Sequence, residues 1–238
     1  MIKKTFFLLS FFSIYILCVC GQKSKEDSIY DNFFISDGDT IRYHSKYSWF
    51  YSNVEWMENE RTQLKALVDS NLNVLTEFKY ERFCPFYGKC GAVMRNGKWG
   101  VVNKKGEEVI PFKYTMFPFS FSDTTSNKEY YVFTKKNKVG VIDSDGETII
   151  PFKWDGIRYF KYVILEMEKD KCRYLYFMKT GKTVPIKKDM IICSDFNAYG
   201  ETIVKDLNLN KYGIMDTSCT IIQPCIYNGL KEVRQHLK

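Results

Sequence analysis

Short runs of alternating apolar and polar residues, separated by turn residues, follow one another along most of the chain. The stretch "GAVMRNGKWGVVNKKGEEVIPFKY", residues 91–114, contains three such runs. The pair Asn96-Gly97 between the first two runs is a strong signal for a tight β-hairpin, and residues 103–106 form the next turn. Alternation with a period of two is typical of strands with one buried face. The stretch therefore predicts a three-stranded antiparallel unit.

The same unit recurs along the chain. The copies occupy residues 65–80, 91–114, 130–154, 163–186 and 202–227, of which the first is degenerate and the fourth is shortened. Four of them close on an aromatic residue: Tyr80, Tyr114, Trp154 and Tyr227. These residues are separated by 34, 40 and 73 positions, and the last step covers two units. Repetition at this period indicates units that bury their apolar faces by stacking. We therefore predict an all-β fold, a tandem array of about five three-stranded antiparallel units, as an open stack in preference to a closed, propeller-like ring.

Each well-formed unit carries a glycine in its middle strand and a proline in its last strand. Glycine inside a strand marks a place where backbone or a ring approaches too closely for a side chain. The aromatic residue beside it points to the opposite side of the pleat, where a large ring is buried against the adjacent unit. Proline cannot donate to a β-ladder, so it marks an edge or the end of pairing. The positions with these predicted structural roles are Trp99, Gly100, Pro111, Tyr114, Gly140, Pro151, Trp154, Tyr212, Gly213, Pro224 and Tyr227.

The tripeptide Lys98-Trp99-Gly100, with the Gly, Val-Ile-Pro and Tyr that follow it, resembles the bacterial WG repeat family, which is named for its Trp-Gly pair. The units around Gly140 and Gly213 are recognisable copies, and the resemblance covers roughly residues 62–230. The family is β-rich, is often exported, and has no activity or cofactor common to its members. The resemblance therefore implies a fold and structural roles, and it carries over no catalytic or cofactor-binding residue.

The chain begins with the pattern of a secretory signal. Lys3 and Lys4 precede an apolar run, residues 5–19, that is shorter than the roughly 20 residues needed to span a bilayer. The lipobox-like sequence Leu-Cys-Val-Cys favours lipid attachment at Cys20, whereas a cut after Gly21 would release a soluble secreted or periplasmic chain. In either case we expect export, and we favour a lipoprotein anchored in the periplasm or on the cell surface.

The predicted segments are residues 1–20 as signal peptide and lipobox, 21–28 as a tether, 29–61 as an N-terminal cap, 62–230 as the repeat domain and 231–238 as a short C-terminal helix or tail.

The net charge narrows the choice of partners. The formal charge of +7 falls to +5 when Lys3 and Lys4 leave with the signal, and the remaining lysines are scattered singly along the strands. Nucleic-acid binding requires a clustered basic stripe and arginine forks, so the sequence argues against it. Weak attraction to anionic envelope polymers is the use of this charge that we expect.

Few residues suggest a disulfide, a metal site or a catalytic group. Cys84 and Cys90 flank a short loop, and they either form a disulfide across it or remain buried thiols. With two histidines and no CxxC pair outside the signal, a zinc site has little support. The "DSDGE" sequence at 143–147 contains the acids of a calcium loop, but its flanking strands predict a hairpin turn instead. The glutamates within residues 55–60 are expected on a solvated face or an irregular helix.

The aromatic residues Phe117, Phe119 and Phe121 alternate along the chain, which places their rings on one face. They are predicted as core of the second unit or, alternatively, as an exposed platform for sugar rings or a protein.

The function that we prefer is a non-catalytic binding or scaffolding module of the bacterial cell envelope, without cofactor or metal. Its partner would be a protein or an anionic glycan, with membrane contact only through the N-terminal lipid. The alternative is an envelope carbohydrate-active enzyme or hydrolase with two carboxylates within about 5–10 Å in a cleft.

Overall fold

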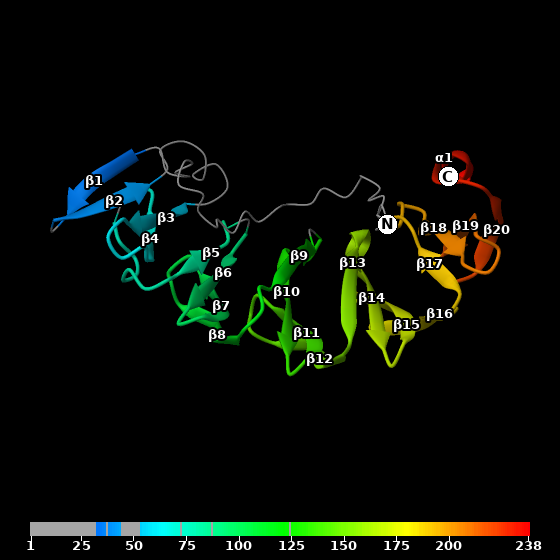
Figure 1. Cartoon of the computed structure of the whole chain (residues 1–238), viewed down its shortest axis with the longest axis horizontal. Helices are drawn as coiled ribbons and strands as arrows, with labels where there is room; N and C mark the ends of the chain where they lie inside the picture. Colours follow the sequence, from blue (N-terminus) through cyan, green and yellow to red (C-terminus); the bar gives the residue numbers. More distant parts are fainter. Residues whose placement is uncertain (1–31, 37, 44–52, 72, 87, 124) are drawn as a thin grey trace, which may run out of the picture.

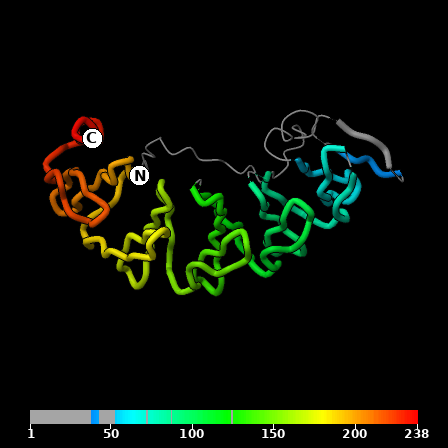
Figure 2. The backbone as a smooth tube through the Cα atoms, turned by 180° about the vertical axis from the view of Figure 1, so that it is seen from behind, coloured from blue at the N-terminus to red at the C-terminus, as the bar shows by residue number. Residues whose placement is uncertain are grey.

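The computed structural model describes residues 32–36, 38–43, 53–71, 73–86, 88–123 and 125–238. They form five antiparallel sheets that follow one another in a curved row, so that the chain traces an open crescent (Figure 1). Seen from behind, the two ends of the row remain apart (Figure 2). The predicted all-β array of about five antiparallel units is confirmed, and it has the form of an open stack rather than a closed ring.

Each sheet contains four strands that are neighbours in chain order. The first consists of β1 (Asn32–Ser36), β2 (Asp39–Tyr43), β3 (Val54–Asn59) and β4 (Lys65–Asp69). The second consists of β5 (Arg82–Phe83), β6 (Cys90–Arg95), β7 (Lys98–Asn103) and β8 (Glu108–Tyr114). The third consists of β9 (Phe119–Asp123), β10 (Lys128–Lys135), β11 (Lys138–Asp143) and β12 (Thr148–Trp154). The fourth consists of β13 (Gly156–Phe160), β14 (Ile164–Lys169), β15 (Cys172–Phe177) and β16 (Lys182–Ile186), and the fifth of β17 (Met190–Ile192), β18 (Glu201–Asp206), β19 (Lys211–Asp216) and β20 (Ile221–Tyr227).

The three strands predicted for each of the second to fifth units are present, and each of these sheets has one strand more. The additional strands, β5, β9, β13 and β17, each pair with only one neighbour and stand at one edge of their sheet. In Figure 1, β5, β9 and β13 lie on the inner side of the crescent, whereas β8 and β12 lie on the outer side. β5 has two residues and β17 has three, which is too short for alternation to be recognised, whereas the alternation of Phe119 and Phe121 in β9 was recognised but not assigned to a strand of the unit.

The first sheet includes the segment expected as the N-terminal cap. β1 and β2 form a hairpin, and β3 pairs with both β2 and β4, so this segment extends the sheet of the first unit. The expected last strand of this unit is reduced to two isolated bridges, Lys65 with Tyr80 and Val68 with Val74.

The tight hairpins follow the turn chemistry of the sequence. Asn96 and Gly97 have φ values of 51° and 67°, and positive φ at both central residues is the geometry of the type I′ turn that matches strand twist. Asp143 begins the turn at 143–147, where its Oδ1 accepts the backbone N–H of Asp145 at 3.0 Å and that of Glu147 at 2.9 Å. Its Oδ2 accepts a hydrogen bond from Lys128 at 2.9 Å. The carboxylate thus holds a hairpin, as the flanking strands predict.

Gly100 lies opposite a three-residue bulge. Trp99 pairs with Tyr114 and Val101 with Ile110, which leaves residues 111–113 facing Gly100. A Cβ added at Gly100 would lie 2.7 Å from the carbonyl oxygen of Ile110 and 3.0 Å from the ring of Phe112. Pro111 begins the bulge, where the ladder is interrupted and a missing N–H is tolerated.

The same bulge recurs in the third and fifth sheets. Gly140 faces residues 151–153, and an added Cβ would lie 2.8 Å from the carbonyl oxygen of Ile150. Gly213 faces residues 224–226, with the corresponding distance 2.7 Å to the carbonyl oxygen of Gln223. Each glycine therefore makes room for a bulge that begins with proline.

Neighbouring sheets pack through their turns and their faces. A Cβ added at Gly106 would lie 2.2 Å from a methyl carbon of Thr76, and one at Gly146 would lie 2.9 Å from the carbonyl oxygen of Val109. Each of these turns thus rests on the sheet before it. Trp99 is 2% exposed and shares a buried cluster with Phe133 of the third sheet. Stacking of this kind is what supplies a core in a repeat array.

The glutamates near Trp56 were predicted on a solvated face or irregular helix, and this is wrong for Glu55 and Glu58, whereas Glu60 is exposed just beyond the strand. Residues 54–59 form the strand β3, all six of whose residues are buried. The Glu58 carboxylate lies 3.2 Å from the Lys65 amine, and Glu55 accepts a hydrogen bond from the Trp56 backbone at 3.2 Å. A buried carboxylate of this kind requires a charged or N–H partner, which the neighbouring strand and the backbone supply here.

The proposed disulfide between Cys84 and Cys90 is not formed in the described structure. The backbone N–H of Cys84 donates to Ala92, so Cys84 lies opposite Ala92 and two positions away from Cys90 along β6. The Cys90 thiol instead faces the next sheet, with its sulfur 3.7 Å from the carbonyl oxygen of Ser144. Both cysteines are buried, which agrees with the alternative of buried thiols.

The C-terminal segment forms a short helix, α1 (Leu230–Val233), followed by a 3-10 turn (Arg234–His236). Val233 is fully buried, and the His236 ring lies 4.7 Å from that of Tyr227, so this segment covers the end of the fifth sheet. No helix in the described part of the chain is long and apolar enough to cross a membrane. The predicted signal, Cys20 and the tether at 21–28 lie outside the described residues.

Candidate functional site

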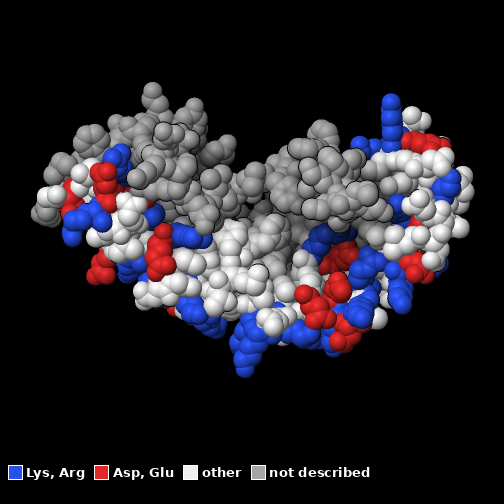
Figure 3. Space-filling model, viewed as in Figure 1, with Lys and Arg blue, Asp and Glu red and all other residues white. Residues whose placement is uncertain are grey.

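The link between β8 and β9 exposes large apolar side chains near the inner side of the crescent. Met116, Phe117 and Phe119 are 58%, 43% and 51% exposed, whereas Phe121 is buried. The prediction that these three rings form core is therefore correct only for Phe121, and the alternative of an exposed platform describes Phe117 and Phe119. On the face shown in Figure 3, white surface covers the middle of the crescent, and charged side chains gather over β13 to β16.

The exposed rings pack against buried rings. The Phe117 ring meets Trp99 edge-on at 4.9 Å between centroids, and the Phe119 ring lies 6.2 Å from Phe121 and 6.4 Å from Tyr159. Phe121 in turn stacks on Tyr159 of the fourth sheet at 4.6 Å. We call Phe117, Phe119, Phe121 and Tyr159 the aromatic strip. These contacts limit the rotamers open to the exposed rings, and a surface ordered in advance lowers the entropic cost of binding.

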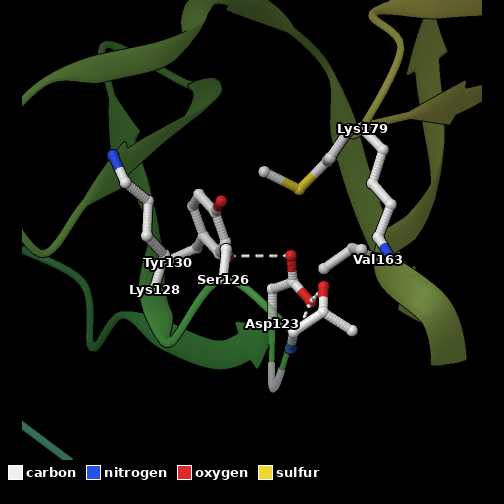
Figure 4. A pocket seen from close by; sticks show the side chains of 8 residues that line it. Asp123, Ser126, Lys128, Tyr130, Val163 and Lys179 are labelled. Atoms are coloured by element: carbon white, nitrogen blue, oxygen red, sulfur yellow. Dashed lines mark hydrogen bonds between the residues drawn. The ribbon is translucent and has the colours of Figure 1, made fainter.

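Two cavities flank the turn between β13 and β14. The first, with a volume of ≈ 330 Å³, lies between the third and fourth sheets, and the second, of ≈ 520 Å³, lies between the fourth and fifth. Val163, Met178 and Lys179 line both. The first is lined in addition by Asp123, Thr125, Ser126, Lys128 and Tyr130 (Figure 4).

The turn between the cavities has an unusual backbone. Tyr162 and Val163 have φ values of 61° and 53°, in the left-handed region that side chains with a Cβ rarely adopt. Val163 is 3% exposed and belongs to the core cluster of Phe121, whereas Tyr162 is 55% exposed beside the second cavity. The conformation thus buries one side chain and projects the other, at a cost of about 1–3 kcal/mol per residue.

The two cavities differ in charge. In the first, burial opposes ionisation of Asp123, but hydrogen bonds from Thr125 and Ser126 and the charge of Lys179 hold the pKa of this carboxyl below its usual value. Figure 4 shows Asp123 and Lys179 on facing walls. The second cavity is lined by Lys179 and Lys182 and by no acidic residue. Its remaining polar lining comes mainly from the turns at 197–200 and 217–218 of the fifth sheet.

Several carboxylates of the described residues have structural partners. Glu166 is bound by Arg158 at 2.6 Å and by Arg173 at 3.1 Å, and Asp123 is occupied by the Thr125 and Ser126 hydroxyls at 2.7 and 2.8 Å. Within the part of the chain described, no group of three or more potential metal-ligating side chains lies together.

The sequence-predicted repeat positions and this surface overlap only in part. Trp99 braces Phe117, and Tyr114 stacks on Phe133 at 4.1 Å within the core. Tyr162 and Lys182 were not singled out from the sequence: no glycine marks the turn at Tyr162, and Lys182, which follows Gly181, is the first residue of an ordinary strand.

These features define a repeat protein, and comparison with protein families identifies the repeat. The chain contains WG-containing repeats at three positions, residues 67–99, 99–123 and 140–162. The second match comprises β7, β8 and β9, and the third runs from β11 through β13. The second and third matches therefore end at or just beyond the inner strand of the following sheet, whereas the first match runs from β4 to β7. None of the curated proteins compared with the chain matches it.

Solved structures have only a distant overall likeness to the chain. A streptogramin B lyase shares 14% identity at a TM-score of 0.33, and the match covers 73% of this chain and 65% of the lyase. A virginiamycin B lyase from Staphylococcus aureus shares 13% identity at a TM-score of 0.34, over 82% of this chain and 69% of the lyase. A eukaryotic initiation factor shares 10% identity at a TM-score of 0.43, over 69% of this chain and 50% of the factor. The chain thus spans about half to two thirds of the length of these proteins, and at these TM-scores the likeness supports no conclusion about this chain.

Proposed function

We propose that the protein is a non-catalytic binding or scaffolding module of the bacterial cell envelope and that it binds through the inner surface of its repeat array. The observation that carries the proposal is the aromatic strip, in which Phe117 and Phe119 are exposed and pack against the buried rings of Trp99 and Phe121. An exposed apolar group fixed on a scaffold is typical of an interaction site. The partner is a protein or an anionic glycan of the envelope, and the lysines of the array add a weak attraction to it.

The location rests on the N-terminal sequence. We propose that the chain is exported and carries lipid at Cys20, which would be its only contact with the membrane. Mass spectrometry of the protein from its native host should find a first residue of Cys20 with acyl groups or, if the chain is released, Gln22 without them. Soluble protein that retains Met1 in the cytoplasm would contradict export.

The binding proposal is tested with immobilised full-length protein and a panel of envelope glycans and envelope protein extracts. We expect retention of one class, and we expect Phe119→Ala to weaken it about tenfold, or ~1.4 kcal/mol. Ile226→Ala is the matched control, because Ile226 is 61% exposed on the outer strand β20. Equal retention by both variants would remove the aromatic strip from the proposal.

The alternative is a carbohydrate-active enzyme or hydrolase of the envelope. The same panel is therefore assayed for turnover. Turnover that is lost on replacing one Asp or Glu, while the fold is kept, would overturn the binding proposal in favour of an enzyme.

A further inference from the structure

We propose that the cavity between the fourth and fifth sheets binds an acidic sugar residue, with its ring on Tyr162 and its carboxylate held by Lys179 and Lys182. This inference rests on the proposed function, because it names a glycan class for a binding module and gives it a second site. The volume of ≈ 520 Å³ lies within the roughly 300–1,000 Å³ range of small-molecule pockets.

The first argument is the position of Tyr162. Its ring is 55% exposed at the edge of the cavity, and the backbone holds it there in a left-handed conformation with φ 61° and ψ 30°. Strain of this kind persists only where the surrounding structure imposes it, and here burial of Val163 does so. The exposed ring offers a flat apolar face, and the C–H face of a pyranose packs well on such a surface.

The second argument is charge. Lys179 and Lys182 both line the cavity, its lining contains no acidic residue, and neither amine forms an ion pair with another described residue. Across the first cavity, the charge of Lys179 stabilises the ionised carboxyl of Asp123, whose oxygens accept hydrogen bonds from Thr125 and Ser126. Two lysines at a cavity whose lining contains no acidic residue favour an anionic ligand.

The third argument is the mixed lining. Ile164, Phe177 and Met178 give an apolar floor, and Thr217 adds a hydroxyl on the opposite wall. Asn197 and Ser218 hold their own turns through hydrogen bonds to neighbouring residues, so they shape the wall. An apolar floor, a flat ring and two cations together fit an acidic pyranose better than a bare inorganic anion, which would leave the floor and the ring unused.

The test is isothermal titration calorimetry of the full-length protein with short oligogalacturonates, their methyl esters and inorganic phosphate. We expect the acid to bind about tenfold more tightly than the ester or phosphate, and we expect its affinity to fall as salt rises. The variants are Tyr162→Gly, Tyr162→Phe and Lys182→Gln, with the exposed Lys105→Gln in the second sheet as a control of equal charge.

Tyr162→Gly separates binding from folding. Glycine adopts a positive φ without strain, so the thermal midpoint should stay unchanged or rise while affinity falls at least fivefold. Tyr162→Phe should bind like the wild type, and Lys182→Gln should bind more weakly than Lys105→Gln. Equal affinities of Tyr162→Gly and wild type, or of acid and ester, would overturn the inference.

The outcomes that would refute the proposed function differ from those that would refute this inference. If envelope material is retained through Phe119 but oligogalacturonate does not bind, the inference is wrong and the binding module stands. If oligogalacturonate binds and Phe119→Ala has no effect on retention of envelope material, the cavity stands and the role of the aromatic strip fails.

Discussion

Replacing Gly100 by alanine tests the physical meaning of the Trp-Gly pair. The new Cβ would lie 2.7 Å from the carbonyl oxygen of Ile110 and 3.0 Å from the Phe112 ring, whereas carbon atoms in good contact are about 3.5–4.0 Å apart. Ile110 is held by its pairing with Val101, so either the bulge must open or Phe112 must leave its rotamer. Overpacking of this kind costs about 1–3 kcal/mol.

Gly156→Ala is the matched control. Gly156 lies in strand β13 without a positive φ, and the nearest atom to its added Cβ is 3.9 Å away, an ordinary contact. Both variants restrict the unfolded chain equally, a gain of about 0.4–1 kcal/mol, so their difference isolates the packing cost. We expect Gly100→Ala to be about 1–3 kcal/mol less stable than Gly156→Ala.

Urea unfolding followed by fluorescence, with a thermal scan beside it, measures this difference. A deficit of 1 kcal/mol corresponds to a melting temperature about 2–4 °C lower in a chain of this size. Gly140→Ala should behave like Gly100→Ala, because its Cβ would lie 2.8 Å from the carbonyl oxygen of Ile150. Midpoints for Gly100→Ala at or above that of Gly156→Ala would refute the packing argument.

Two further predictions concern charged groups. Burial opposes ionisation of Asp143, but hydrogen bonds from Lys128 and the turn amides hold the pKa of this carboxyl below its usual value, so its contribution to stability is present above about pH 4 and lost as the pH falls further. The wild type should therefore lose more stability than Asp143→Asn between about pH 5 and pH 3 in urea melts, and parallel profiles would contradict this. A Cβ at Gly88 would lie 1.3 Å from Glu129 Oε1, so Gly88→Ala should displace this side chain and destabilise through loss of the hydrogen bonds that it accepts from the Lys89 backbone at 2.6 Å and the Tyr131 hydroxyl at 3.0 Å. The double variant with Glu129→Ala should lose at least about 0.5 kcal/mol less than the sum of the two single variants. Additive losses in that cycle would show that the two residues do not compete for space.

The repeat could be predicted because its signals are local. The turn at Asn96-Gly97, the glycine of the middle strand and the proline of the last strand lie within 20 residues of one another, and each has a single strong structural meaning. They place β7 and β8 and their counterparts correctly. The inner strands lack such signals, because a strand at a sheet edge has one partner and, in β17, only three residues.

The buried glutamates and the candidate site depend on contacts between distant segments. Glu58 looks solvent-exposed in the sequence, and only its pairing across to Lys65 shows how its charge is balanced. The second cavity combines the turns at Tyr162, Lys182 and Thr217, which belong to two sheets. The exposure of Phe119 likewise depends on where the neighbouring sheet ends, which no alternation pattern contains.

The boundaries of the sequence repeat do not coincide with the boundaries of the sheets, and this affects how such a protein can change in evolution. The matches at 99–123 and 140–162 start in the third strand of one sheet and end at or just beyond the inner strand of the next, whereas the match at 67–99 runs from β4 to β7. Recombination between two Trp-Gly segments in third strands would therefore join the first half of one sheet to the last strand of another, and every sheet in the product would still have four strands. Loss or gain of a repeat in this way alters the length of the crescent, while the bulge opposite each glycine survives at the junction. The array can therefore change length without loss of the pairing within any sheet.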